Sequence, residues 1–85
     1  MQPKIFPNPA GKNSYIEFTL DKRTNVQIDV YNNTGQKLGT AFNGTLNRGK
    51  QIISLSHLKN IAVGGYFATI KTNEGTGFVK FIVIE

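Results

Sequence analysis

The chain has 85 residues, which is enough for one compact domain and too few for two. Hydrophobic residues make up 39% and charged residues 18%, which fits a globular domain, and the absence of cysteine excludes disulfides and thiolate metal sites. The formal net charge is +5, but the ten Lys and Arg residues are spread along the chain, which favours a basic surface over a nucleic-acid-binding site.

Residues 1–14 are predicted to be an extended lead-in or linker. Their three prolines keep the backbone extended and exclude a helix: Pro3, Pro7 and Pro9. The N-terminus lacks the basic segment and apolar stretch of a signal peptide, and no apolar run approaches the roughly 20 residues of a membrane-spanning helix. We therefore expect no membrane insertion, and we favour a piece of a longer precursor over a complete cytosolic protein.

Two strands are predicted next, at residues 15–20 and 26–30. Their apolar residues occupy every second position, the period of a half-buried strand. These residues are Ile16, Phe18 and Leu20, then Val26, Ile28 and Val30.

A three-residue hairpin loop is predicted at Asn33-Thr34-Gly35, because glycine adopts the positive φ that such a loop requires. The loop fixes which residues of the two strands face each other. The predicted pairs are Asn32 with Gln36, Val30 with Leu38, Ile28 with Thr40 and Val26 with Phe42.

Turn signals at residues 43–44 and 47–49 leave a short edge strand or loop around Thr45-Leu46. A further strand is predicted over residues 51–56, with Ile53 and Leu55 on one face. His57-Leu58-Lys59 is predicted to form one helical turn, with Leu58 filling the core.

The last hairpin is predicted from strands at residues 66–72 and 76–84, joined by a two-residue loop at Glu74-Gly75. On one face it pairs Ile70 with Val79, Ala68 with Phe81 and Tyr66 with Val83. The opposite face is also apolar, with Phe67, Phe78, Ile82 and Ile84. We expect something to cover this outer face.

About seven short strands at this spacing predict an all-β fold. The best fit is an immunoglobulin-like β-sandwich of antiparallel strands over residues 15–85.

The titratable groups are too few and too scattered to predict a catalytic site. The chain has one histidine and five carboxylates. His57 follows Ser56, and adjacent residues of an extended chain point to opposite faces. The carboxylates are far apart in sequence, so we expect no metal and no cofactor.

Read from end to end, the pattern resembles the type A C-terminal sorting domain of the type IX secretion system, from about Pro7 to Ile84. The order and spacing of the elements carry this resemblance more than any single motif. The matching positions are Pro7, Asn8, Pro9, Tyr31, Gly35, Gly49, Leu58, Gly65, Tyr66, Lys80 and Phe81.

The resemblance implies a secretion signal that targets a larger cargo protein to the type IX export machinery for passage across the outer membrane. It implies as partners the translocon, the shuttle and the sortase, with the domain as a substrate and not an enzyme. It also implies passage through the periplasm, followed by a place at the cell surface or release.

The candidate recognition surface is the outer face of the last hairpin, because Lys80 lies between two core-facing residues and must point outward. This surface comprises Phe67, Phe78, Lys80, Ile82 and Ile84. The alternative is a fibronectin-like or carbohydrate-binding adhesion module, in which Phe67, Phe78 and Tyr15 would form the ligand face.

Overall fold

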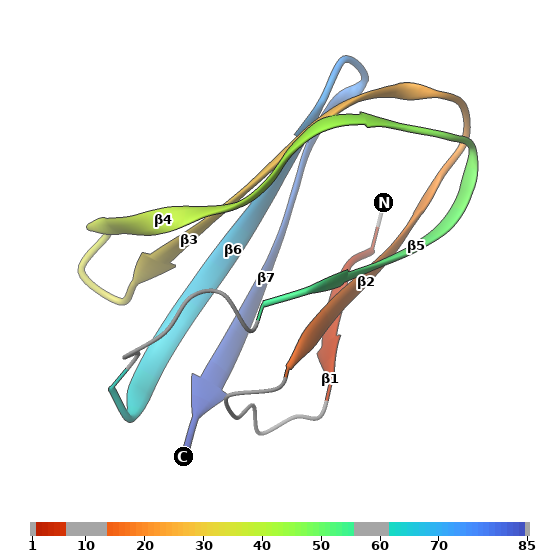
Figure 1. Cartoon of the computed structure of the whole chain (residues 1–85). Coiled ribbons are helices and arrows are strands. Elements are labelled where there is room, and N and C mark those ends of the chain that lie inside the picture. The colour runs from red at the N-terminus through yellow and green to blue at the C-terminus, as the bar shows by residue number, and fades with distance from the viewer. Residues whose placement is uncertain (1, 7–13, 56–61, 85) are drawn as a thin grey trace.

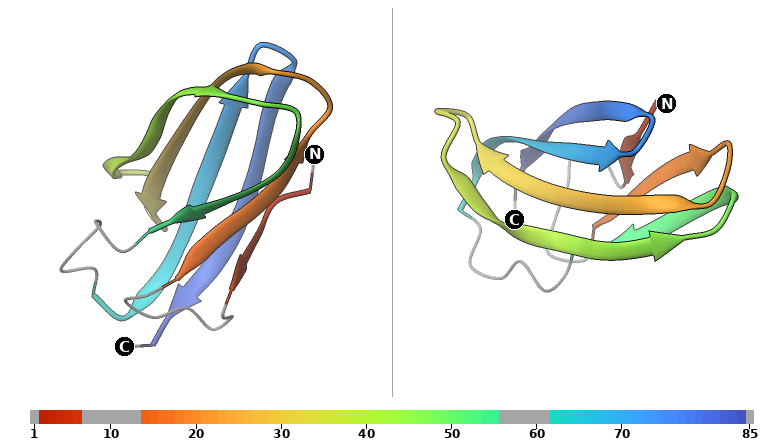
Figure 2. Two further views of the ribbon diagram at one scale, coloured as in Figure 1. Left: turned by 45° about the vertical axis from the view of Figure 1, so that its right-hand side comes forward. Right: turned by 90° about the horizontal axis from the view of Figure 1, so that it is seen from above.

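Two antiparallel sheets pack face to face in the computed structural model, which describes residues 2–6, 14–55 and 62–84 (Figures 1 and 2). The described strands are β1 (Lys4–Phe6), β2 (Tyr15–Leu20), β3 (Thr24–Asn32), β4 (Lys37–Leu46), β5 (Gly49–Ser54), β6 (Gly64–Thr72) and β7 (Gly75–Val83). One sheet has the order β1-β2-β5 and the other β4-β3-β6-β7. The predicted immunoglobulin-like β-sandwich is confirmed.

No helix is found in the described residues, and none there could therefore cross a membrane. The predicted helical turn at His57-Leu58-Lys59 lies outside the described residues.

One long hairpin contributes strands to both sheets. β2 continues into β3 through residues 21–23, and β4 continues into β5 through residues 47–48, so that each chain segment bends from one sheet into the other (Figure 2). The two segments pair on both sides of the bend, with β3 against β4 and β2 against β5. At the bend, Arg23 Nη1 donates to Asn47 Oδ1 at 2.8 Å.

The core lies between the sheets, and its residues occupy every second position along the strands. The predicted inward residues of β2 and β3 are buried, and so are those of the last hairpin except Val79, which is partly buried against the core. The largest contributions come from Ile16, Phe18, Ile28 and Ile70, each at most 2% exposed. A fully buried side chain of this size contributes about 1.5–3 kcal/mol to stability.

β1 is a strand that the sequence pattern did not reveal. Its residues fall in the predicted lead-in, yet they pair antiparallel with β2 and bring Ile5 into the core. Three residues are too few to show an alternating pattern, so only the pairing identifies the strand.

The loop of the first hairpin is as predicted, because Gly35 has a φ of 91° and the Asn32 N–H donates to the Gln36 carbonyl at 3.0 Å. The predicted pairs beyond this loop are wrong. Val30 faces Gly39, Ile28 faces Phe42 and Val26 faces Gly44. Two bulges cause the shift, because Leu38 and Ala41 of β4 are extra residues without a partner on β3.

The predicted turn at residues 43–44 is also wrong. Asn43 and Gly44 lie within β4, which runs on through Thr45 to Leu46 and forms an edge of its sheet. A Cβ at Gly44 would come within 3.3 Å of the Phe42 ring. This glycine therefore permits close packing against an aromatic ring inside a strand.

The loop of the last hairpin is Asn73-Glu74, and not Glu74-Gly75 as predicted. The pairs move by two residues, to Ala68 with Val79 and Tyr66 with Phe81. Because side chains alternate with a period of two, this shift leaves every residue on its predicted face.

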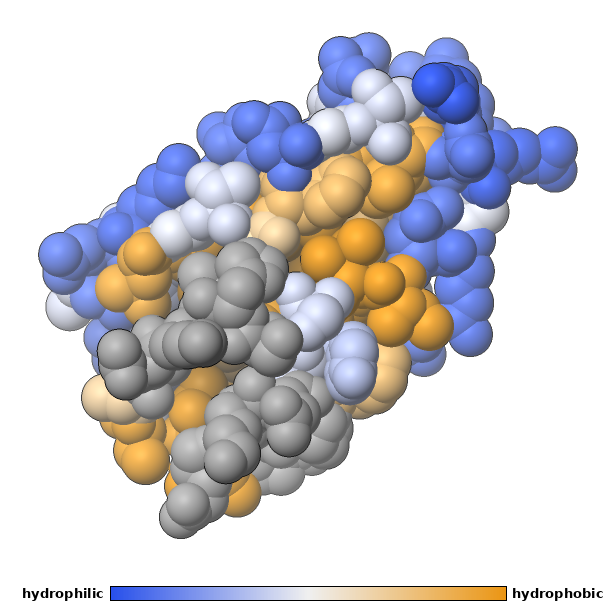
Figure 3. Space-filling view, viewed as in Figure 1, coloured by the Kyte–Doolittle hydropathy of each residue, from blue (hydrophilic) through white to orange (hydrophobic). Residues whose placement is uncertain are grey.

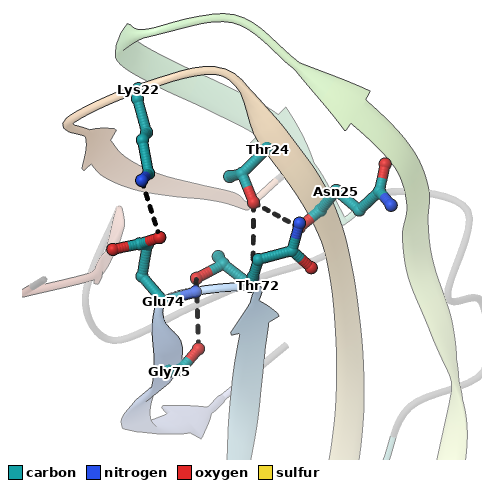
Figure 4. Close-up of polar contacts among 7 residues, drawn as sticks. Lys22, Thr24, Asn25, Thr72, Glu74 and Gly75 are labelled. Carbon is teal, nitrogen blue, oxygen red and sulfur yellow. Dashed lines mark hydrogen bonds and ion pairs between the residues drawn. The ribbon is translucent and has the colours of Figure 1, made fainter.

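Contacts with the bend between β2 and β3 fix this loop (Figure 4). The Asn73 N–H donates to Thr24 Oγ1 at 3.2 Å, and Lys22 Nζ lies 3.1 Å from Glu74 Oε2. Thr72 Oγ1 also accepts the Glu74 N–H at 3.0 Å. A turn position decided by such distant partners cannot be read from local sequence.

An ionised carboxylate is enclosed on the outer face of the four-stranded sheet. Asp29 of β3 is 1% exposed, and its Oδ1 accepts a hydrogen bond from Thr40 Oγ1 at 2.8 Å. Gln27 Nε2 donates to Asp29 Oδ2 at 3.0 Å, and Lys37 Nζ lies 3.4 Å from Oδ1. Burial raises the pKa of Asp29, but these hydrogen bonds and the charge of Lys37 outweigh it and bring the pKa below its ordinary value of 3.8.

Asp29→Asn is expected to lower the free energy of unfolding at pH 7 by about 1.5–3 kcal/mol, because hydrogen bonds to a charged acceptor are lost. A carboxyl with a lowered folded-state pKa stabilises the fold above the unfolded-state pKa and loses this effect as pH falls through the folded-state pKa. The difference between wild type and variant should therefore shrink below about pH 4. Denaturant unfolding of both proteins from pH 2 to 7 measures this difference in the free energy of unfolding. Asp21→Asn, at an exposed position, is the control, and a difference that persists at pH 2 would contradict the assignment.

Gly35→Ala is expected to destabilise the chain by about 1–2 kcal/mol, since an alanine is strained at a positive φ. The strain is conformational, because no atom lies within 4 Å of a Cβ built at this position. Gly65→Ala is the matched control, since it avoids positive φ and its Cβ would meet Asn33 Cβ at 3.9 Å. Equal unfolding midpoints for the two variants would refute this account of the loop.

Candidate recognition surface

The outer face of β6 and β7 carries a group of exposed apolar side chains close to the end of the chain. The pairing places Phe67 opposite Lys80, Phe78 opposite Thr69 and Ile82 opposite Gly65. Phe78 is 59% exposed, Ile82 is 57% exposed and Ile84, just beyond β7, is 51% exposed. β7 is thus apolar on both faces, since Phe81 and Val83 lie in the core.

Aromatic rings continue this surface across three strands. Tyr31 of β3 stacks on Phe67 of β6, with ring centroids 5.0 Å apart and planes 11° apart. Phe78 of β7 meets Phe67 edge to face at 6.3 Å. Both arrangements are favourable for aromatic pairs, so Phe67 is held between two rings and forms a fixed centre for the surface.

A hollow of about 560 Å³ adjoins these rings. Gly65 lies at this hollow and has no side chain to fill it, while Phe67 and Ile82 line it together with Asn33. The hollow is large enough to accept an apolar side chain from another molecule.

The charge of this sheet face is positive. Of its three lysines, Lys37 is paired with Asp29, whereas Lys71 and Lys80 have no acidic partner among the described residues. Lys80 is exposed and alternates along β7 with Phe78 and Ile82. The surface thus combines an unpaired cation with apolar neighbours.

Of the seven described positions that carried the family resemblance, four do not lie at this surface. Tyr66 and Phe81 stack in the core with centroids 5.8 Å apart, and the Tyr66 hydroxyl donates to the Ala62 carbonyl. Gly35 lies in a loop, and Gly49 begins β5 with a φ of 115°. Tyr31, Gly65 and Lys80 do lie at the surface. Four other positions are outside the described residues, namely Pro7, Asn8, Pro9 and Leu58.

Tyr31 is the member of the surface that sequence reasoning did not assign. It alternates with the inward residues of β3, which marks it as outward-facing. Only the pairing of Tyr31 with Phe67 across β3 and β6 places it in the aromatic row.

The three aromatic residues of the adhesion alternative do not form one face. Tyr15 lies on β2 in the other sheet, where it stacks on Phe6 at 5.6 Å. Phe67 and Phe78 lie on the outer face of the four-stranded sheet. The predicted ligand face is therefore wrong.

A second apolar region belongs to the sandwich interior. Hydrophobic side chains are visible at the edge between β4 and β5, bordered by hydrophilic ones (Figure 3). Phe42, Leu46 and Ile53 of these strands are partly buried and pack against the core.

Among the described residues, no three histidines or carboxylates gather as metal ligands.

Comparison with protein families gives a match over nearly the whole chain. The family described as the secretion system C-terminal sorting domain matches residues 4–85, which include β1 and the whole sandwich. No curated protein and no solved structure matches the chain. The sandwich and this match together confirm the predicted family and its function. The chain belongs to the secretion system C-terminal sorting domain family and is a C-terminal sorting signal for type IX secretion, which directs export across the outer membrane.

Proposed function

We propose that the type IX export machinery recognises this signal through the outer face of β6 and β7. The residues of this recognition surface are Phe67, Phe78, Lys80, Ile82 and Ile84. The observation that carries the proposal is the exposure of Phe78 and Ile82 on the outer side of β7 and of Ile84 just beyond its end. Contiguous exposed apolar side chains beside a charged residue are typical of sites that bind another protein.

The core has a supporting role in this proposal. Tyr66 and Phe81 hold β6 and β7 against the opposite sheet from the inner side. Gly35 and Gly49 allow the backbone to adopt a positive φ, in the first hairpin loop and at the start of β5. The sorting function would then depend on these residues through folding, and on the recognition surface through contact.

The route of the cargo follows from the family role. The domain would travel as part of a larger cargo protein, pass through the periplasm, and meet the translocon, the shuttle and the sortase. The export machinery would recognise the domain and then process it as a substrate. The domain itself would not act as a catalyst.

Substitution of exposed residues tests this proposal better than truncation does. Deleting residues 80–85 would remove Phe81 and Val83, which are each 5% exposed in the core, so failed export would also follow from unfolding. Single exposed side chains can be changed without opening the core.

Phe78→Ser and Ile82→Ser, in a reporter cargo carrying the full 85-residue chain, are each expected to reduce export about tenfold or more. An apolar side chain buried at an interface contributes about 1.5–3 kcal/mol, and 1.4 kcal/mol is a factor of ten in affinity. The measurement is the fraction of reporter at the cell surface and in the medium of a type IX-competent strain.

Ile52→Ser is the matched control, because Ile52 is 52% exposed on the outer face of the other sheet. Unfolding midpoints of the three variants show whether the fold is retained. Normal export of both β7 variants, or equal loss with Ile52→Ser, would rule out this surface as the recognised one.

A further inference from the structure

β7 differs from the other described edge strands because it is long and regular. β1 has three residues, β5 has six, and β4 carries two bulges. β7 has nine residues, and every pair with β6 from Gly75 to Val83 keeps one register without a bulge. Short strands, bulges and lysines are the usual means of preventing an edge from pairing with another chain, and of these β7 has only the single Lys80.

The hairpin loop determines which backbone groups of β7 are free. Thr72 and Gly75 close the two-residue loop, so they exchange hydrogen bonds as a pair, and every second pair does the same. The peptide groups of Val79 and Phe81 therefore point to β6. Those of Phe78, Lys80 and Ile82 point away from β6, to the edge of the sheet, where no other described strand pairs with β7.

The residues with free peptide groups also carry the exposed side chains. Phe78, Lys80 and Ile82 project from the outer face of the sheet. A strand added to this edge would hydrogen-bond to these residues and place its own side chains directly beside theirs on the outer face. Backbone pairing and side-chain selection would thus use the same three positions.

The charges define the chemistry of the added strand. Lys80 has no acidic partner among the described residues, and opposite charges across neighbouring strands are favourable. Phe78 and Ile82, two residues away on either side, would face apolar residues. The matching sequence therefore has an acidic residue with an apolar residue two positions before it and two positions after it.

A second copy of this chain fits the edge poorly. Residues 75–83 contain no Asp or Glu, so a second β7 could not place an acid opposite Lys80. Each copy also carries a formal net charge of +5, which opposes association.

We propose that β7 accepts an antiparallel strand from a partner protein, pairing along residues 77–83, with an acidic residue opposite Lys80 and apolar residues opposite Phe78 and Ile82. This deepens the proposed function and rests on it for the statement that the partner belongs to the export machinery. Recognition would then be by strand addition, in which backbone hydrogen bonds supply affinity and alternate side chains supply specificity.

A synthetic peptide tests the pairing directly. The probe is the heptapeptide Thr-Ile-Thr-Glu-Thr-Ile-Thr with blocked ends. The control peptide has lysine in place of glutamate. Amide hydrogen exchange of the 85-residue chain is followed by NMR. We expect the glutamate peptide to protect the amides of Phe78, Lys80 and Ile82, whereas those of Val79 and Phe81 are already bonded to β6 and serve as internal references.

Two variants separate strand addition from simple contact with the face. Lys80→Glu should weaken binding of the glutamate peptide at least about threefold and strengthen binding of the lysine peptide, since like charges directly opposite each other are unfavourable. Ile82→Pro removes a free edge N–H without breaking the bonds to β6, so it should weaken binding more than Ile82→Ala does.

Several results would overturn the proposal. These are no binding at about 1 mM peptide, binding without protection of the three amides, equal effects of Ile82→Pro and Ile82→Ala, or protection of the same amides by concentration-dependent dimerisation of the chain. Export is not part of this measurement, so a failure here would leave the sorting test of the recognition surface unaffected.

Discussion

The fold depends on the bend in the long hairpin formed by β2–β3 and β4–β5. Both arms pass from one sheet to the other at the same level, at residues 21–23 and 47–48, and remain paired on either side. The bend sets the two sheets face to face and so creates the space that the core fills. Contacts at the bend also hold the loop of β6 and β7, through Thr24 and Lys22, and thereby set the position of the last hairpin.

The position of the last hairpin gives β7 two different apolar faces. The inner face contributes Phe81 and Val83 to the core, so it ties the end of the chain to folding. The outer face carries Phe78 and Ile82 and is exposed in the isolated chain. Recognition through this outer face, as proposed, would require the folded chain, because the inner contacts hold the outer side chains beside the rings of β6 and β3.

Thr40 illustrates why part of this surface escaped prediction. In the predicted register it faces Ile28 and points into the core, but the bulge at Leu38 places it opposite Asp29 on the outer face. There its hydroxyl donates to the Asp29 carboxylate, which also binds Lys37. A bulge adds one residue to one strand and leaves no local signature in this sequence, so the polar cluster beside the aromatic row appears only when the strands are paired.

The sequence by itself determined β2, β3, β6 and β7, their inward and outward faces, and the doubly apolar character of β7, because alternation is a local property of an extended chain. It therefore placed Phe67, Phe78, Lys80, Ile82 and Ile84 on one face without knowledge of the pairing. Only the tertiary structure decided the strand β1, the register of both hairpins, the stacking of Tyr31 on Phe67 and the free edge of β7. Each of these depends on partners that are distant in the chain, such as Asn73 with Thr24, and alternation carries no information about such partners.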